Sequence, residues 1–227
     1  MSNALLVLTL ALVCGCAGTH AAHKSAESTT GAGDADAGVR PASMAQLLNL
    51  TLRDREVPQA REITTEQFHP KTEKNSLPPV SDVNCQKVLQ IINGAGSYAS
   101  VHQIFNWKGD IFPGDSLISS YEGTRATDYF RILVKAINSC NSYSGTGYAG
   151  RYRATLTVEP PPDVGDQGAS FRIVIPTENG LRTEGHVVVR TGNLIAMFEN
   201  LNVGGTAEFP PGLVVKQIQR LDEARKG

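Results

Sequence analysis

Alternation of apolar and polar residues in the second half of the chain is the feature that most constrains the fold. Residues 152–158 and 171–175 carry an apolar residue at every second position, as strands with one buried and one solvent-facing side do. Residues 187–190 and 194–198 flank Thr191-Gly192-Asn193, and Gly and Asn tolerate the positive φ of a tight hairpin turn. The sequence therefore predicts a largely antiparallel sheet.

Four other segments carry apolar residues at helical spacing. Residues 98–105 and 116–121 predict a further hairpin, while the polar stretch after Pro58 and the Gly- and Tyr-rich stretch after Cys140 are expected to be loops. The expected fold class is α+β, a largely antiparallel sheet packed with helices. The predicted helices are residues 44–55, a helix capped by Ser81 or Asp82 and ending at Gly94, one capped by Thr124 and ending at Cys140, and one that begins at Pro211 and contains Leu221.

The N-terminal segment resembles a bacterial lipoprotein signal peptide. Its apolar run, residues 4–13, is too short to cross about 30 Å of hydrocarbon as a helix, so a cleaved segment is favoured over a membrane span. Val13-Cys14-Gly15-Cys16 supplies the aliphatic, variable, small and cysteine positions of a lipobox. We therefore expect lipidation of Cys16 and anchoring on the extracytoplasmic face of the cell membrane. The alternative is an ordinary secretory signal cleaved near Ala17 or Ala22.

Composition divides the chain into a signal peptide (1–16), a flexible tether (17–42) and a folded domain (43–227). The tether is nearly all Ala, Gly, Ser, Thr and Asp, which bury too little surface to offset the entropy of ordering. Its acidic run does not form a calcium loop, because Ala45 stands where a bidentate Glu is required. The folded part is large enough for a single core.

The charge of the chain argues against a nucleic-acid partner. The formal net charge is −1, and the basic residues are scattered along the sequence. Nucleic-acid binding would require them to gather on one electropositive face.

Cys85 and Cys140 are the two cysteines of the folded part. An extracytoplasmic compartment is oxidising, so we expect them to form a disulfide that joins the start of one helix to the end of another. The alternative, a pair of free thiols or a redox site, would usually show close spacing such as Cys-x-x-Cys, and these two cysteines are far apart.

The residues that could carry chemistry do not form a catalytic set. His102 and His186 lie in predicted strands, beside neither a Cys nor a Gly-x-Ser-x-Gly elbow, and a lone strand histidine is usually a surface or satisfied core residue. Gly94-Ala95-Gly96 follows a helix instead of a strand, so it lacks the context for phosphate binding. Asp163 and Asp166 fit turn chemistry. We expect no enzyme activity, no cofactor and no metal.

Four aromatic residues stand where no core pattern demands them. They are Trp107 and Phe112 in the first hairpin loop, and Tyr143 and Tyr148 in the loop after Cys140. Loops on a rigid scaffold often carry recognition, and such rings offer apolar area together with a polar edge. We expect them to form a ligand site, with Trp107→Ala or Tyr148→Ala weakening binding at a nearly unchanged melting temperature. The alternative is that they close over the ends of the core.

The order of these features over residues 44–225 resembles a known family, the extracellular sensor domain of the mycobacterial kinase PknH and its actinobacterial lipoprotein relatives. This resemblance implies a twisted antiparallel sheet with packed helices and a surface cleft for a ligand. The chain has no Gly-rich nucleotide loop and no His-Arg-Asp loop, so only the sensing half is expected, and it lacks the cysteines for that domain's second disulfide. The resemblance rests on the Leu-rich first helix before Pro58, Cys85, Cys140, Gly165-Asp166, the segment Val187-Val188-Val189-Arg190-Thr191-Gly192-Asn193, and a last helix with Gln217 and Leu221.

These observations together predict a membrane-anchored lipoprotein with a non-catalytic sensor or ligand-binding domain. Its ligand would be a small molecule or a component of the cell envelope. The alternative is an envelope interaction protein that docks on a partner protein. A partly apolar cleft near Trp107 and Tyr148 would favour the first reading, and a flat exposed apolar patch would favour the second.

Overall fold

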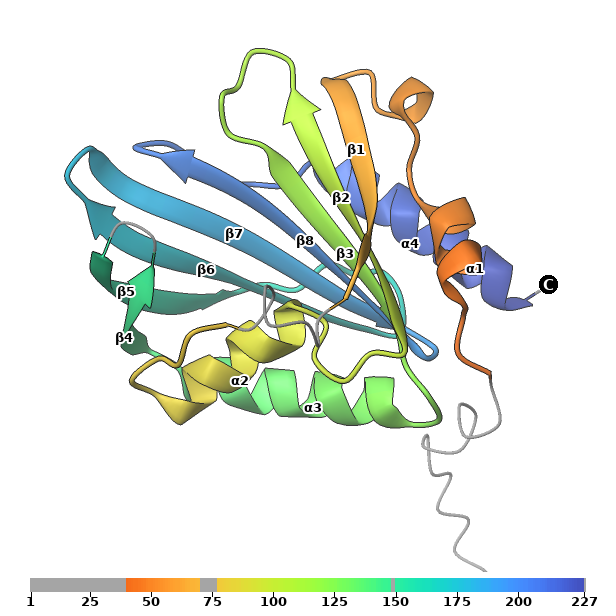
Figure 1. Ribbon diagram of the computed structural model, residues 1–227, viewed down its shortest axis with the longest axis horizontal. Coiled ribbons are helices and arrows are strands. Elements are labelled where there is room, and N and C mark those ends of the chain that lie inside the picture. The colour runs from red at the N-terminus through yellow and green to blue at the C-terminus, as the bar shows by residue number, and fades with distance from the viewer. Residues whose placement is uncertain (1–39, 70–76, 148–149, 227) are drawn as a thin grey trace, which may run out of the picture. The chain divides into compact units, whose positions relative to one another are not determined.

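One antiparallel sheet organises the described part of the chain. The computed structural model describes residues 40–69, 77–147 and 150–226 (Figure 1). Within them, eight strands pair in the order β1-β2-β3-β8-β7-β6-β5-β4, and helices pack on the sheet, which confirms the expected α+β class. The elements are α1 (Met44–Leu50), a 3-10 turn η1 (Asp54–Glu56), β1 (Ala60–Phe68), α2 (Val83–Ile92), β2 (Ala99–Trp107), β3 (Gly114–Ser120), α3 (Arg125–Ile137), β4 (Ser142–Gly147), β5 (Gly150–Glu159), β6 (Gln167–Thr177), β7 (Gly180–Thr191), β8 (Leu194–Val203) and α4 (Pro211–Lys226).

The two halves of the sheet meet at the pairing of β3 with β8. All of β3 pairs with residues 194–200 of β8, and residues 201–203 of β8 continue beside β7. Figure 1 shows the strands twisting apart beyond this pairing, so that β1, β2 and β3 separate from β6, β7 and β8 at one end. The twist agrees with the right-handed twist of strands in general.

Helices α2 and α3 pack side by side on one face of the sheet, which we call the α2/α3 face (Figure 1). Asp82 begins α2, because its carboxylate accepts hydrogen bonds from the backbone N–H groups of Asn84 and Cys85, each at 2.9 Å. Gly94, at φ +71°, follows the end of this helix. The core on this face includes Val88, Ile91 and Ile92 of α2, Phe130, Leu133 and Ile137 of α3, and Leu117, Phe171, Ile173, Val188, Ile195 and Met197 of the sheet.

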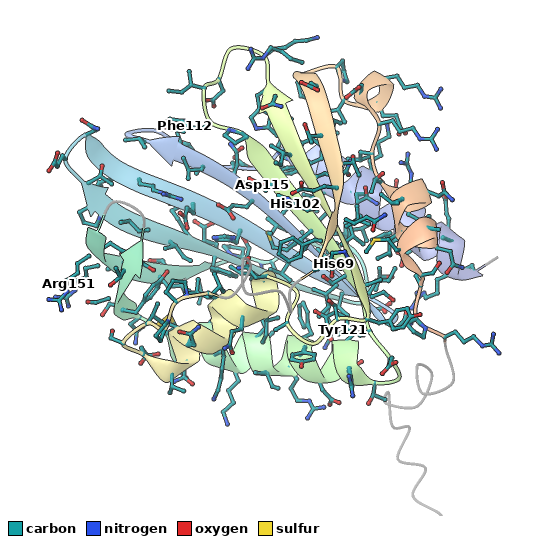
Figure 2. The ribbon with its side chains drawn as sticks, viewed as in Figure 1. His69, His102, Phe112, Asp115, Tyr121 and Arg151 are labelled. Atoms are coloured by element: carbon teal, nitrogen blue, oxygen red, sulfur yellow. A yellow bond between two sulfur atoms is a disulfide. The ribbon has the colours of Figure 1, made fainter. Side chains whose placement is uncertain are left out.

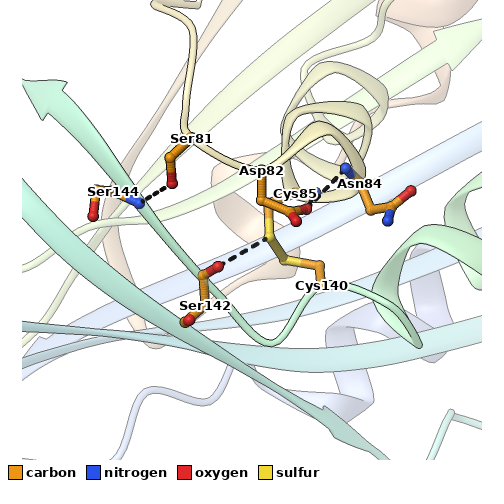
Figure 3. The surroundings of a disulfide bond; sticks show 7 residues. All are labelled: Ser81, Asp82, Asn84, Cys85, Cys140, Ser142 and Ser144. Carbon is orange, nitrogen blue, oxygen red and sulfur yellow. Dashed lines mark hydrogen bonds between the residues drawn. A yellow bond between two sulfur atoms is a disulfide. The ribbon is translucent and has the colours of Figure 1, made fainter.

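The expected disulfide between Cys85 and Cys140 is confirmed (Figure 3). It joins the first turn of α2 to the chain just after α3, and both cysteines are buried. Beside it, the Ser81 N–H donates to the Ser144 carbonyl at 2.9 Å, and the Ser144 N–H donates to the Ser81 hydroxyl at 2.8 Å. These contacts fasten the start of α2 to the outer edge of β4.

The disulfide is expected to contribute strongly to stability. Its cysteines are 55 positions apart, and closing a loop of that size in the unfolded chain corresponds to about 4 kcal/mol of stabilisation. We expect the double variant Cys85→Ser/Cys140→Ser to lose about 4 kcal/mol of unfolding free energy and roughly 8–16 °C in melting temperature. Thermal and urea unfolding of the oxidised protein, the reduced protein and the variant measure this. Equal stability of all three would contradict it.

Helices α1 and α4 pack on the opposite face, which we call the α4 face. Their core is completed by apolar side chains from the middle of the sheet. The buried residues on the α4 face include Leu47 of α1, Val101, Phe105 and Trp107 of β2, Ile118, Val189, Ala196 and Phe198 of β3, β7 and β8, and Leu213, Val214, Ile218 and Leu221 of α4.

No helix among the described residues is long and apolar enough to cross a membrane.

Helix α1 ends five residues before the position that its sequence predicts. After Leu50 the backbone becomes extended, because side chains of α4 take over the hydrogen bonds of the carbonyls there. The Gln217 amide donates to the Leu50 carbonyl at 2.8 Å, and the Arg220 guanidinium donates to the Thr51 carbonyl at 2.6 Å. Of the remaining residues of the predicted helix, only Asp54 and Arg55 are helical, as part of the 3-10 turn η1.

Two strands, β1 and β4, lie where the sequence predicts loops. Both are the edge strands of the sheet. An edge strand has one neighbour and more exposed surface, so it needs few apolar residues, and most residues of β1 are exposed. The hydrogen bonds to β2 and β5 therefore define these strands, and apolar alternation does not.

Candidate functional site

The α4 face contains a pocket of about 500 Å³, which we call the α4 pocket. Apolar groups supply most of its lining: a run of prolines, Phe209, and valines from β7 and α4. Its boundaries are residues 159–164 after β5, Ser170 and Arg172 of β6, residues 185–187 of β7, residues 206–209, and Pro211, Val214 and Val215 of α4.

Two glycines allow the loops around the α4 pocket to approach the sheet. A Cβ atom on Gly185 would lie 2.0 Å from the Ala207 carbonyl oxygen, and a Cβ atom on Gly168 would lie 2.8 Å from the Pro162 carbonyl oxygen. No other residue type fits at such distances without displacing backbone. The pocket is thus built by loop contacts that only glycine permits at these two positions.

Polar and charged residues also line the α4 pocket: Glu159, Asp163, Ser170, Arg172, His186, Thr206 and Glu208. The Ser170 hydroxyl is occupied, because it donates to the His186 carbonyl at 3.1 Å. Arg172 forms an ion pair with Glu159, and its Nε–H is buried without a hydrogen-bond partner among the described residues. A largely apolar lining with some polar groups is the usual composition of a small-molecule site.

Trp107 belongs to the core of the α4 face, so its predicted role as a free ligand contact needs correction. Its ring stacks on Phe105, with centroids 5.3 Å apart, and meets Phe209 edge-on at 5.6 Å. Its indole N–H donates to the Asn200 side chain at 2.8 Å. Only 7 % of the residue is exposed, along a hollow of about 330 Å³ shared with Lys108.

This placement reverses the stability effect expected for Trp107→Ala. The variant removes a buried ring and leaves the Asn200 amide unpaired, so we expect a loss of about 3–5 kcal/mol in unfolding free energy. Urea unfolding measures it. Phe112→Ala, a half-buried residue of the β2–β3 loop, is the control and should cost far less. A Trp107→Ala variant as stable as the wild type would contradict the buried placement.

The structure does not bring the predicted aromatic residues into one site. Tyr143, on β4, is buried on the α2/α3 face against Tyr152, with ring centroids 6.1 Å apart, and burial raises the pKa of its hydroxyl. It therefore lies on the opposite face of the sheet from Trp107. Phe112 lies in the β2–β3 loop (Figure 2). Tyr148 lies outside the described residues.

A row of charged side chains crosses the α2/α3 face beyond the helices. His102 of β2 is hydrogen-bonded on both sides, by Nδ1 to Glu66 of β1 at 3.0 Å and by Nε2 to Asp115 of β3 at 2.7 Å. Figure 2 shows His102 and Asp115 close together near the middle of the sheet. Burial opposes the charged ring, but the hydrogen bonds to Asp115 and Glu66 outweigh burial, and the pKa of His102 is raised.

Stability should therefore depend on pH through His102. A raised folded-state pKa stabilises the fold below the unfolded pKa, and this contribution is lost as pH rises through the folded value. We expect His102→Gln to lose more stability relative to the wild type at about pH 5.5 than at about pH 9. Urea unfolding at both pH values measures this difference. Equal losses at the two pH values would show that the imidazolium has no such role.

The same face holds a second group, Glu184 and His186 of β7 with Glu199 of β8. His186 is 2 % exposed, and its ring stacks on Phe171 at 4.9 Å. Its Nε2 lies 3.9 Å from Glu184, and its Nδ1 lies 3.8 Å from Glu199. Burial raises the pKa of the Glu199 carboxyl to about 6. Burial works against charge on His186, yet the neighbouring Glu199 and Glu184 raise its pKa.

Sequence reasoning missed this group because it considered His186 alone. The signal was available in the predicted hairpin, since a turn at Gly192-Asn193 pairs Thr191 with Leu194 and therefore His186 with Glu199. Glu184 is two residues from His186 and so lies on the same face of the strand. Counting the register outward from the turn would have found the three residues.

Comparisons with known proteins assign no function to this chain, so a function has to be inferred from the geometry of its fold and its pocket. The described residues form a helix-covered antiparallel sheet with a cavity of about 500 Å³ on one face. Neither protein-family models nor curated protein sequences match this chain.

Proposed function

We propose that this protein is a lipid-anchored extracytoplasmic protein whose domain binds a small, largely apolar ligand in the α4 pocket, without catalysis of its own. The α4 pocket is the observation that carries the proposal. Its volume, about 500 Å³, falls within the range of about 300–1,000 Å³ typical of ligand sites. The resemblance to PknH-type sensor domains supports a sensing role for such binding.

The lining of the α4 pocket selects the chemical class of the ligand. Pro160–Pro162, Phe209, Val214 and Val215 offer apolar surface. The buried Arg172 Nε–H offers one hydrogen bond, which suits a ligand with a carbonyl or ether oxygen. An anionic ligand is disfavoured, because the Arg172 charge is already paired with Glu159, and Asp163 and Glu208 also line the pocket.

The predicted N-terminal region explains where the domain would act. Cys16 would carry the lipid, and residues 17–42 would separate the domain from the membrane. A flexible chain of that length spans about 25–30 Å root-mean-square. The pocket would then face the extracytoplasmic compartment, in reach of envelope components.

Filling the α4 pocket should abolish ligand binding without unfolding the protein. Val215 is half-buried at the pocket, and Val215→Trp places a large ring there. We expect the protein purified gently from its own envelope to show an excess mass under native conditions that disappears on denaturation, and Val215→Trp to lose this excess. Native mass spectrometry makes the measurement, and the melting temperature checks folding.

Val134→Trp is the matched control, because Val134 is exposed on α3, on the other face of the sheet. It should keep the excess mass. An unchanged excess in Val215→Trp would exclude the α4 pocket as the binding site. No excess in any of the proteins would favour docking on an envelope partner, with crosslinking as the direct test.

A further inference from the structure

The geometry of the α2/α3 face points to a metal site in addition to the ligand pocket. We propose that Glu184, His186 and Glu199 together bind one divalent cation of the zinc class. This site does not depend on the proposed ligand binding, because it lies on the other face of the sheet from the α4 pocket. Strand β7 contributes to both: Gly185, Val187 and the His186 carbonyl border the α4 pocket, whereas the His186 ring stacks on Phe171 on the other face.

The register of the β7–β8 hairpin brings the three side chains together. Glu184 and His186 are two residues apart on β7, and His186 pairs directly with Glu199 of β8. Residues at i and i+2 share a face, and directly opposite residues have Cβ atoms about 4.5–5.5 Å apart. Two ligands from one strand and a third from its neighbour can therefore converge without any loop rearrangement.

The distances suit a cation shared between the side chains better than hydrogen bonds among them. One donor atom from each residue lies within 4.8 Å of the other two. Around a tetrahedral cation with bonds of about 2.0–2.2 Å, donor atoms lie about 3.3–3.6 Å apart, so side-chain shifts of about 1 Å would bring the three donor atoms to these separations. The two His186 distances, 3.9 and 3.8 Å, are too long for hydrogen bonds.

His186 provides the independent sign that something is missing from this cluster. It is 2 % exposed, yet neither ring nitrogen has a hydrogen-bond partner among the described residues. Buried polar atoms are normally paired. A cation bound through one ring nitrogen would give that nitrogen the partner that it lacks.

The charges around the cluster favour a cation. Asp115 of β3 pairs directly with Glu199, so two carboxylates stand opposite each other on neighbouring strands. Asp115 is held by His102, while Arg182 occupies one oxygen of Glu184 at 2.6 Å, and the other oxygen faces His186. Among the residues that the structure describes, the ion pair found for Glu199 is the one with His186 at 3.8 Å. A divalent cation would neutralise this carboxylate.

Solvent can reach the cluster even though His186 is buried. The side chains of Glu184 and Glu199 are 14 % and 23 % exposed. A mixed imidazole and carboxylate donor set suits zinc, manganese, iron or cobalt, and it argues against a calcium-type site, which uses oxygen ligands alone.

Zinc titration of the purified protein tests the site. After treatment with EDTA, we expect calorimetry to show one Zn²⁺ bound per folded domain, a rise in melting temperature, and visible absorption bands when Co²⁺ replaces Zn²⁺. Glu199→Gln and His186→Gln should each weaken binding by at least about tenfold. Glu66→Gln makes the same chemical change at the far end of the charged row and should leave the affinity within about twofold.

The outcomes separate the site from background binding and from unfolding. His20 and His23 of the predicted tether are present in every variant, so uptake that is equal in the wild type and Glu199→Gln would overturn the proposal. No uptake by the wild type would overturn it as well. If Glu199→Gln fails to fold, Glu184→Gln replaces it, with circular dichroism as the check. Val215→Trp should bind Zn²⁺ normally whether or not the α4 pocket binds a ligand.

Discussion

The pairing of β3 with β8 is the interaction on which the rest of the structure depends. These strands are far apart in the sequence, and their ladder joins β1–β3 to the five strands from β8 to β4. Alternate residues of β3 contribute to both cores, Leu117 on the α2/α3 face and Ile118 on the α4 face. Small buried residues lie next to this junction: Ser119 of β3 shares a hydrogen bond with Ser100 of β2 at 2.8 Å, and a Cβ atom on Gly94 would lie 2.9 Å from the Ser119 hydroxyl. The end of α2 can therefore rest directly on the sheet.

The sequence predicts well the elements that are stabilised by contacts between neighbouring residues, and the elements in which one apolar face packs on the core. The β7–β8 hairpin follows from Gly192-Asn193, the start of α2 from Asp82, and the disulfide from the two cysteines of the folded part together with the oxidising compartment that the N-terminal segment predicts. The edge strands β1 and β4 could not be found in this way, because their hydrogen-bond partners come from elsewhere in the chain. The early end of α1 has the same cause, since Gln217 and Arg220 lie in the last helix.

The candidate sites were harder to predict for a related reason. An aromatic residue in a predicted loop is ambiguous between recognition and packing, and Trp107 packs because Phe209, which follows β8 by several residues, folds back onto it. The α4 pocket also draws its lining from segments that are distant in sequence. The sequence does contain the two glycines, Gly168 and Gly185. Only the structure shows why glycine is needed there, because the carbonyl groups of Pro162 and Ala207 lie against them.

Strand β7 shows how one short sequence can serve two faces of the sheet. Glu184 and His186 point to the charged row, whereas Gly185 and Val187 border the α4 pocket. A shift of one residue in register would exchange these sets, burying carboxylates under α4 and placing glycine among the charges. The tight turn at Gly192-Asn193 prevents that shift, because it fixes the pairing from Thr191 outward. The geometry of both candidate sites thus rests on one turn and on the ladder that joins β8 to β3.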